Sequence, residues 1–217
     1  MTPMRFELEE WSGLLLLPND NLATPKIKAA GRLDWDRNFA NIPEVAALQP
    51  GQVVFDVGAF IGDTTRLFLN LGCEVHAFEP RPDTFVCLLH NCPEAHCYNV
   101  ALGTGQRFET ATATGGNLGG YPLRDGLRYA VGLDALCAQR LDFLKIDTEG
   151  MDAEVLSGGI KTVMAYHPTI HIECNPAALA GFGRTETDLI GVLKCLGYTR
   201  FQETYRYGDS HWDLVCV

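Results

Sequence analysis

The stretch VVFDVGAFIGDTTRLFLNLGCEVHAFEP, residues 53–80, contains a strand, a glycine turn, a helix and a second strand. The apolar run at its start is typical of a strand that is covered on both faces of a sheet. Helical spacing follows over DTTRLFLNL, and Gly72 is predicted to lie just past the end of this helix. This order of elements predicts a parallel α/β sheet.

The same alternation continues to residue 198. Further strands are expected at 96–103, 141–147 and 168–174, and helices at 81–91, 153–167 and 185–198. Pro82 is predicted to begin the first of these helices, and Thr185 and Asp188 to form a capping box on the last. Two closing strands, TRFQETY and HWDLVCV, have no helix between them, so we expect them to pair antiparallel. The fold class is therefore α/β, a doubly wound sheet in three layers.

Two regions interrupt this alternation. Residues 1–30 contain RFELEE and GLLLLP, which we expect to be strands beside the main sheet. Residues 103–133 have the pattern of a hairpin around a glycine-rich loop. We interpret residues 1–217 as a single domain, in which 1–49 are an N-terminal decoration and 50–217 are the core.

Composition excludes several classes of function. The 17 basic and 27 acidic residues give a net charge of −10, so no nucleic-acid partner is expected. No apolar run reaches the length of about 18 residues that a membrane span needs. MTPMRFELEEW has acids where a secretory signal would have basic residues, which predicts a cytoplasmic protein without a membrane partner. The three cysteines and two histidines of CLLHNCPEAHC (87–97) do not match a zinc module, so we expect buried, reduced thiols.

An acid or amide follows or ends each of the five expected parallel strands, where ligands bind in sheets of this type. These residues are Asp56, Glu79, Asn99, Asp147 and Glu173. The glycine turn DVGAFIGD differs from the dinucleotide fingerprint G-x-G-x-x-G because Phe60 replaces the middle glycine.

The charge of this turn indicates which ligand it suits. Asp56 and Asp63 bracket it and would repel a diphosphate, but they suit a ligand with an ammonium or sulfonium charge, such as S-adenosylmethionine. An acid at Glu79 is placed to accept hydrogen bonds from ribose hydroxyls, a feature shared with NAD-binding folds. For Asp63 the alternative interpretation is a helix N-cap.

These segments resemble a known family. FDVGAFIGDTT, HAFEPRPDTF, NVALG, LDFLKIDTEGMDAEVLSGG and IHIECNP are similar, in this order, to the motifs of FkbM-type methyltransferases, which are class I S-adenosylmethionine-dependent enzymes. The resemblance extends over about residues 50–176, and KIDTEGMD is its most specific part. It implies a Rossmann-like sheet of seven strands, mostly parallel, with an antiparallel last strand. Thr148 and Asp152 depart mildly from the family pattern, which usually has an aliphatic residue and often Glu there.

The resemblance also implies cofactor contacts. The turn would contribute Asp56, Gly58, Phe60, Gly62 and Asp63; Glu79 would hold the ribose beside Pro80 and Arg81; Asn99, Val100 and Ala101 would lie by the adenine; and Asp147 would lie by the methionine end or the acceptor.

A hydroxyl acceptor must lose its proton as it attacks the methyl group. Asp147 and Glu173 stand at the correct strand ends and are the predicted catalytic residues, with Glu149 as a further candidate. His171 lies in the middle of a strand and is expected to be a satisfied core histidine. His167 lies at the opposite end of the sheet.

A metal is the less favoured alternative. Asp147, Glu173 and Asn175 loosely resemble the carboxylate and amide ligands of Mg²⁺ in catechol-type O-methyltransferases, but their spacing differs, so we assign no metal ligands. In the other interpretation, Glu173 and Asn175 bind loop backbone.

The expected function is S-adenosylmethionine-dependent O-methylation of a small molecule, natural product or glycan. Three alternatives stay open: an N-methyltransferase of the same fold, an NAD-dependent dehydrogenase and a non-catalytic nucleoside-binding scaffold. Residues 110–123 are interpreted as a lid from which Tyr121 reaches the acceptor, or else as an ordinary flexible hairpin.

Overall fold

The computed structural model describes residues 6–109, 116–120 and 124–217. Seven strands form one sheet in the order β10–β11–β9–β8–β3–β4–β5, in which only β11 runs against the others. The strands are β3 (Val53–Val57), β4 (Glu74–Phe78), β5 (His96–Tyr98), β8 (Phe143–Ile146), β9 (Thr169–Cys174), β10 (Phe201–Tyr207) and β11 (His211–Cys216). The predicted fold class and the antiparallel pairing of the last two strands are confirmed.

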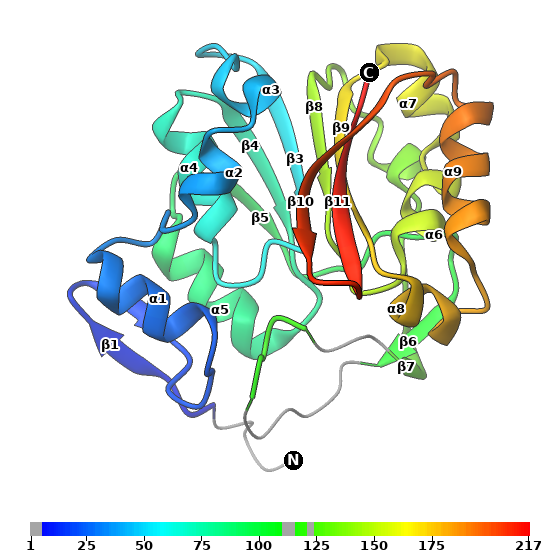
Figure 1. The fold of residues 1–217 in the computed structure, drawn as a ribbon. Helices are drawn as coiled ribbons and strands as arrows, with labels where there is room; N and C mark the ends of the chain where they lie inside the picture. Colours follow the sequence, from blue (N-terminus) through cyan, green and yellow to red (C-terminus); the bar gives the residue numbers. More distant parts are fainter. Residues whose placement is uncertain (1–5, 110–115, 121–123) are drawn as a thin grey trace.

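Helices cover both faces of this sheet, with α4 and α5 on one side and α6, α7 and α9 on the other (Figure 1). Their bounds are α1 (Ala23–Ala30), α2 (Arg37–Ala40), α3 (Pro43–Ala46), α4 (Asp63–Asn70), α5 (Pro82–Asn91), η1 (Leu133–Leu136), α6 (Asp152–Ser157), α7 (Ile160–Tyr166), α8 (Pro176–Gly181) and α9 (Glu186–Cys195). In the part of the chain that the structure describes, no helix is long and apolar enough to cross a membrane.

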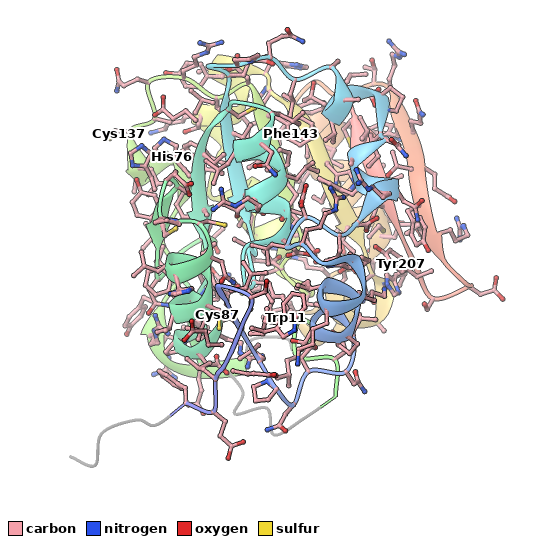
Figure 2. All side chains as sticks on the ribbon, turned by 90° about the vertical axis from the view of Figure 1, so that its left-hand side faces the viewer. Trp11, His76, Cys87, Cys137, Phe143 and Tyr207 are labelled. Atoms are coloured by element: carbon pink, nitrogen blue, oxygen red, sulfur yellow. The ribbon has the colours of Figure 1, made fainter. Side chains whose placement is uncertain are left out.

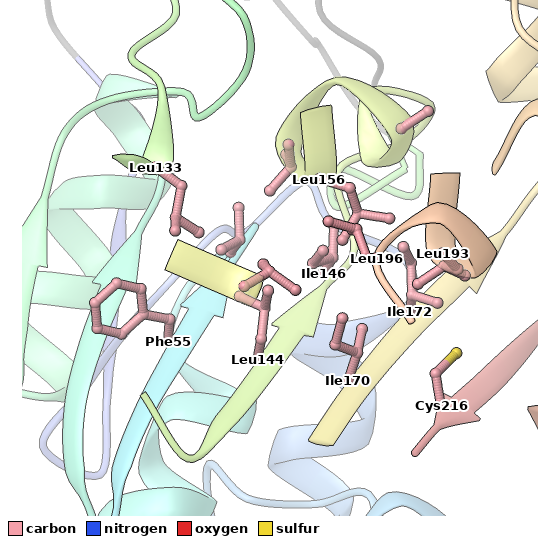
Figure 3. Close-up of a cluster of buried hydrophobic side chains, with 14 of the residues drawn as sticks. Phe55, Leu133, Leu144, Ile146, Leu156, Ile170, Ile172, Leu193, Leu196 and Cys216 are labelled. Atoms are coloured by element: carbon pink, nitrogen blue, oxygen red, sulfur yellow. The ribbon is translucent and has the colours of Figure 1, made fainter. Parts of the chain in front are cut away.

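Alternating side chains of β3 fill the two sides of the core. Phe55 and Val57 point into the cluster beneath α6, α7 and α9, whereas Val54 points into the opposite cluster with Phe68 of α4. Figure 3 shows the first cluster, to which Leu144, Ile146, Ile170 and Ile172 of the neighbouring strands contribute. All eight cysteines lie in the described part of the chain and are free thiols.

The ends of the helices follow from their sequences. Pro82 is the first residue of α5, and Thr185 and Asp188 form the capping box of α9, as predicted. Gly72 lies just past α4 with a φ of 83°, also as predicted. The N-cap interpretation of Asp63 is wrong, because Gly62 is the N-cap and Asp63 is the first helical residue.

The single helix predicted over residues 153–167 is wrong. The chain forms α6 and α7, separated by Gly158 and Gly159. A Cβ at Gly158 would lie 1.9 Å from the carbonyl oxygen of Gly103, and the Gly158 carbonyl accepts a hydrogen bond from Asp134 of η1. The break therefore makes room for the loop after β5 and for η1.

The two N-terminal strands also differ from the prediction. β1 (Glu9–Trp11) and β2 (Leu14–Leu16) form their own sheet and pack against α5 instead of beside the main sheet. The Asn91 side chain at the end of α5 binds both the N–H and the carbonyl of Leu15. Trp11 and Cys87, labelled in Figure 2, belong to the apolar cluster between these elements.

The predicted hairpin is confirmed as β6 (Arg107–Glu109) paired antiparallel with β7 (Arg124–Tyr129). The predicted lid lies mostly outside the described residues, and Tyr121 is among those not described.

Candidate functional site

A cavity of about 430 Å³ lies at the carboxyl ends of the parallel strands. Nine of the predicted cofactor residues line it: Gly58, Phe60, Asp63, Glu79, Pro80, Arg81, Val100, Ala101 and Asp147. The other predicted catalytic residue, Glu173, lines it as well. Asp56, Gly62 and Asn99 are not among the lining residues. Asp56 and Asn99 form hydrogen bonds with the lining residues Thr64 and Glu79, and Gly62 is the N-cap of α4.

Gly58 begins the turn after β3 and has no room for a side chain. Its φ is 80°, and a Cβ there would lie 1.8 Å from the carbonyl oxygen of Asp147. Its N–H donates to the carbonyl of Phe78 at the end of β4. Three strand ends therefore meet at this glycine, which brings backbone against the cavity.

Glu79 fixes the turn from the opposite side. Its Oε2 accepts the N–H of Phe60 at 2.9 Å, and Phe60 itself has a left-handed φ of 48°. Oε1 accepts the N–H of Arg81 and the hydroxyl of Thr84, each at 2.8 Å. Burial raises the pKa of Glu79 to about 7, although these donors oppose the shift. The carboxyl group is thus held in one orientation at the wall of the cavity.

Asp56 is fully buried beneath the turn. Its Oδ2 accepts the hydroxyls of Thr64 and Thr65 from the first turn of α4, at 2.8 and 2.6 Å. Its Oδ1 lies 3.3 Å from Nζ of Lys145. Asp56 therefore orients the start of α4 and a buried lysine.

Lys145 is a functional candidate that the sequence analysis missed. Its Nζ donates to the carbonyl of Gly58 at 2.8 Å and lies 3.6 Å from Asp147. Burial opposes the charge on Lys145, but Asp56, Asp147 and Asp63 outweigh it and raise the lysine pKa. The available signal was one lysine in the otherwise apolar strand FLKI.

Asp63 begins α4 at the wall of the cavity. Desolvation raises its pKa to about 6, although Lys145 opposes this shift. A carboxyl group at a helix start disfavours an anion there, since it occupies the position where a phosphate would bind.

Asn99 fastens the end of β5 to the end of β4. Its Nδ2 donates to the carbonyl of Glu79 at 2.9 Å, and its Oδ1 accepts from Arg128 of β7. Arg128 also donates to the carbonyl of Pro80 at 2.6 Å. These contacts hold the backbone behind Val100 and Ala101, the two apolar residues at this side of the cavity.

Three carboxyl groups converge on the floor of the cavity. Asp147, Glu149 and Glu173 each place an oxygen within 4.8 Å of the others. Burial and then the neighbouring acids raise the pKa of Glu173 far above its usual range and raise that of Glu149 as well. Among the described residues, Oε2 of Glu173 has no hydrogen-bond partner. Such a cluster can accept a proton or hold a cation.

The cluster differs from the metal alternative in the sequence analysis. Asn175 does not belong to it, because its Oδ1 accepts the N–H of Ala178 and caps α8. Glu149 stands in the cluster instead, with a left-handed φ of 55°. The backbone-binding interpretation is therefore right for Asn175 and wrong for Glu173, whose Oε1 lies 3.6 Å from Nε2 of His211.

His171 lies in the core but also lines the cavity. Its Nε2 lies 3.4 Å from the hydroxyl of Thr204, and its ring meets Phe39 edge-on. Burial lowers its pKa to about 3, so the ring is neutral. Its Nδ1 has no partner in the described part of the chain, so the expectation of a satisfied histidine is only half right. His167 ends α7 and stacks on Tyr198, away from the cavity.

A set of aromatic side chains, the aromatic wall, forms a further part of the lining. It comprises Trp35, Phe39, Tyr205 and Tyr207. Two of these residues belong to the N-terminal 49, which the sequence analysis treated as a decoration. Trp35 is overlain by Nζ of Lys26 at 4.3 Å.

Residues 116–120 contact both the N-terminal segment and the end of β4. The N–H of Leu118 donates to Asp20, and the Leu118 carbonyl accepts from Arg81 at 2.6 Å. Leu118 therefore links the N-terminal segment, through Asp20, to Arg81 just after β4.

Comparison with known proteins agrees with this geometry. Residues 130–200 match the family model of the methyltransferase FkbM domain, which confirms the resemblance over these residues. No curated protein sequence matches the chain.

Solved structures share the fold. Methyltransferase FkbM from Methylobacillus flagellatus KT has a TM-score of 0.57 at 14% identity, covering 90% of this chain and 53% of its own. This chain thus spans about half of that protein. A TehB-like SAM-dependent methyltransferase from Corynebacterium glutamicum has a TM-score of 0.54 at 15% identity, covering 89% of this chain and 93% of its own. A precorrin-6y C5,15-methyltransferase from Geobacter metallireducens has a TM-score of 0.52 at 14% identity, covering 84% and 88%.

Proposed function

We propose that this chain, whose residues 130–200 match an FkbM methyltransferase domain, transfers the methyl group of S-adenosylmethionine to a hydroxyl oxygen of a small molecule or glycan. The observation that carries the proposal is the cavity at the strand ends, whose lining includes both the hydrogen-bonded Glu79 and the carboxyl groups of Asp147, Glu149 and Glu173.

The residues of the cavity suit this cofactor. Glu79 is oriented to accept hydrogen bonds from ribose hydroxyls, because three donors already fix its carboxyl group. Val100 and Ala101 offer an apolar wall for an adenine ring. Asp63 and Asp147 supply negative charge for an amino group and a sulfonium, whereas Asp63 at the start of α4 disfavours the diphosphate of NAD.

Bound S-adenosylmethionine supplies a methyl group that its sulfonium charge already activates. The chain has to orient the acceptor, exclude water and remove the acceptor proton. Glu173 is the best-placed base, because it lines the cavity, its Oε2 has no partner among the described residues, and its raised pKa makes it a stronger base once it has lost its proton. Asp147 lies beside it with 46% of its side chain exposed and is placed to orient the acceptor.

The aromatic wall supports an acceptor that contains a ring. Trp35, Tyr205 and Tyr207 offer faces on which a sugar or an aromatic ring can stack. The two tyrosine hydroxyls and the carboxyl groups of the floor supply hydrogen-bonding partners for hydroxyls on such a ring.

N-methylation is the second candidate, favoured by one observation. Five acids lie at or around the floor of the cavity: Asp147, Glu149, Asp152, Glu173 and Asp213. Lys145 is a buried cation among them. A protonated amine would be attracted to this floor, and the same base would have to deprotonate it before transfer. Mass spectrometry of the methylated product distinguishes O-methyl from N-methyl derivatives.

Calorimetric titration with S-adenosylhomocysteine tests the proposal. We expect saturable binding, no binding of NADH, and a loss of about tenfold or more in Glu79→Gln, because its neutral amide removes a charge-assisted acceptor. Glu203→Gln, on the surface of β10, is the matched control and should bind as the unaltered chain does. Binding of NADH instead, or no binding of S-adenosylhomocysteine, would overturn the proposal.

A further inference from the structure

We propose that Glu74, His76 and His96 form a site for a divalent transition-metal ion of borderline softness, of which Zn²⁺ is the first choice, at the edge of the main sheet. None of these three residues lines the cavity described above. In Figure 2, His76 lies toward the margin of the molecule on the outer strands.

The sheet itself places the three side chains together. His76 of β4 and His96 of β5 are direct partners in the parallel ladder. Glu74 precedes His76 by two residues and therefore lies on the same face of the sheet. One ligand atom from each residue lies within 4.8 Å of the other two.

The distances suit a tetrahedral ion. With metal–ligand bonds of about 2.0–2.2 Å, neighbouring ligand atoms in such a site lie roughly 3.4 Å apart. Oε1 of Glu74 is 3.3 Å from Nε2 of His76 and 3.9 Å from Nε2 of His96. His96 must approach Glu74 by about half an ångström and turn its ring, which is stacked on that of His76, so that both Nε2 lone pairs meet at the ion. Its side chain is 57% exposed, so this movement is open to it.

A neighbouring hydroxyl orients the central ligand. Nδ1 of His76 lies 3.2 Å from the hydroxyl oxygen of Tyr98, which can accept its N–H. That hydrogen bond leaves the lone pair on Nε2, the atom that faces Glu74. The ring of His76 also packs on Phe55, which holds one face of it.

The donor set selects the ion. Two imidazoles and one carboxylate favour Zn²⁺, Co²⁺, Ni²⁺ or Cu²⁺ over Mg²⁺ or Ca²⁺, which prefer oxygen. The carboxyl cluster in the cavity has the opposite preference, because all of its donors are oxygens. The choice between zinc and magnesium therefore reports which cluster an ion occupies.

The ion would join two strands at a weak edge. β5 has three residues and, among the described strands, pairs only with β4. Val100 and Ala101, just beyond its end, line the cavity. An ion that binds the folded chain and not the unfolded one raises the free energy of unfolding by mass action.

Titration of the full chain with ZnCl₂, followed by calorimetry and thermal unfolding, tests this site. We expect one equivalent of zinc to bind and to raise Tm, and Co²⁺ in its place to give the visible absorption of a tetrahedral or five-coordinate ion. His96→Gln and Glu74→Gln should each weaken this binding by about tenfold or more, because each loses one of three ligands.

Two control variants make the result specific. His90→Gln alters an exposed histidine at the end of α5, and Asp147→Asn removes a carboxylate from the cavity cluster; both should keep the zinc equivalent. Zinc binding that survives His96→Gln, that is lost with Asp147→Asn, or that Mg²⁺ displaces at equal concentration would overturn the proposal. Binding of S-adenosylhomocysteine by His96→Gln is measured alongside, so that failure of this site is separable from failure of the proposed function.

Discussion

Asp213 of β11 lies directly opposite Glu173 of β9 in the antiparallel ladder, and both carboxyl groups are buried at the cavity. Like charges in directly opposed positions of a sheet repel each other. Burial raises both pKa values, so a proton on either group relieves this repulsion, and Tyr207 donates a hydrogen bond to Asp213.

Asp213→Asn is expected to stabilise the protein at alkaline pH. Burial, followed by the charge of Asp147, raises the pKa of Asp213 to about 7. The folded chain therefore binds more protons than the unfolded chain between about pH 4 and about pH 7, so its stability falls as the pH rises through this range. The variant should gain several degrees in Tm at about pH 8 and nothing at about pH 4, measured by thermal unfolding. Asp209→Asn, at an exposed site, is the control, and an equal gain at both pH values would contradict the argument.

Glu173→Gln is expected to lower kcat by about 10²- to 10⁴-fold if Glu173 accepts the acceptor proton. Affinity for S-adenosylhomocysteine should stay within about threefold, because Glu173 lies on the acceptor side of the cavity. In the unaltered chain, the rate should rise with pH as the group with the raised pKa loses its proton. Retention of both kcat and this pH dependence in the variant would exclude Glu173 as the base.

Lys145→Met is expected to destabilise the protein by about 3–5 kcal/mol, because it leaves Asp56 buried without its cation. Chemical unfolding measures this loss. The double variant Asp56→Asn/Lys145→Met should recover a substantial part of it, since no uncompensated charge then remains. If the double variant is no more stable than the single one, Lys145 acts through packing instead of charge.

Trp35→Ala is expected to raise the KM for the acceptor while leaving the affinity for S-adenosylhomocysteine unchanged. The side chain lines the cavity from the N-terminal segment, and the proposed function assigns this aromatic part of the lining to the acceptor. Steady-state kinetics with varied acceptor, and calorimetry with S-adenosylhomocysteine, separate the two effects. Trp35→Phe keeps an aromatic face and should recover most of the acceptor affinity.

Local patterns predicted the sheet, and nine of the predicted cofactor residues line one cavity. The segment 53–80 combines a doubly buried strand, a glycine turn and an amphipathic helix, and each signal is confined to a few neighbouring residues. The acids at the strand ends lie together because parallel strands end at the same edge.

The errors arose where distant contacts decide the structure. Gly158 ends α6 because the loop at Gly103 occupies the space a continuous helix would need. Lys145 becomes part of the site only when β3 and β8 pair and bring Asp56 beside it. The local signals, the Gly158–Gly159 pair and a lysine in an apolar strand, do not identify these distant partners.

The lining of the cavity comes from separate lengths of chain. The turn and the strand ends between residues 57 and 147 contribute the proposed cofactor residues, whereas Trp35 and Phe39 come from ahead of β3, the first strand of the main sheet. Under the proposed function, exchange of the first 49 residues between relatives is expected to change the acceptor preference and to keep the methyl donor. This leading segment would then be a unit of diversification.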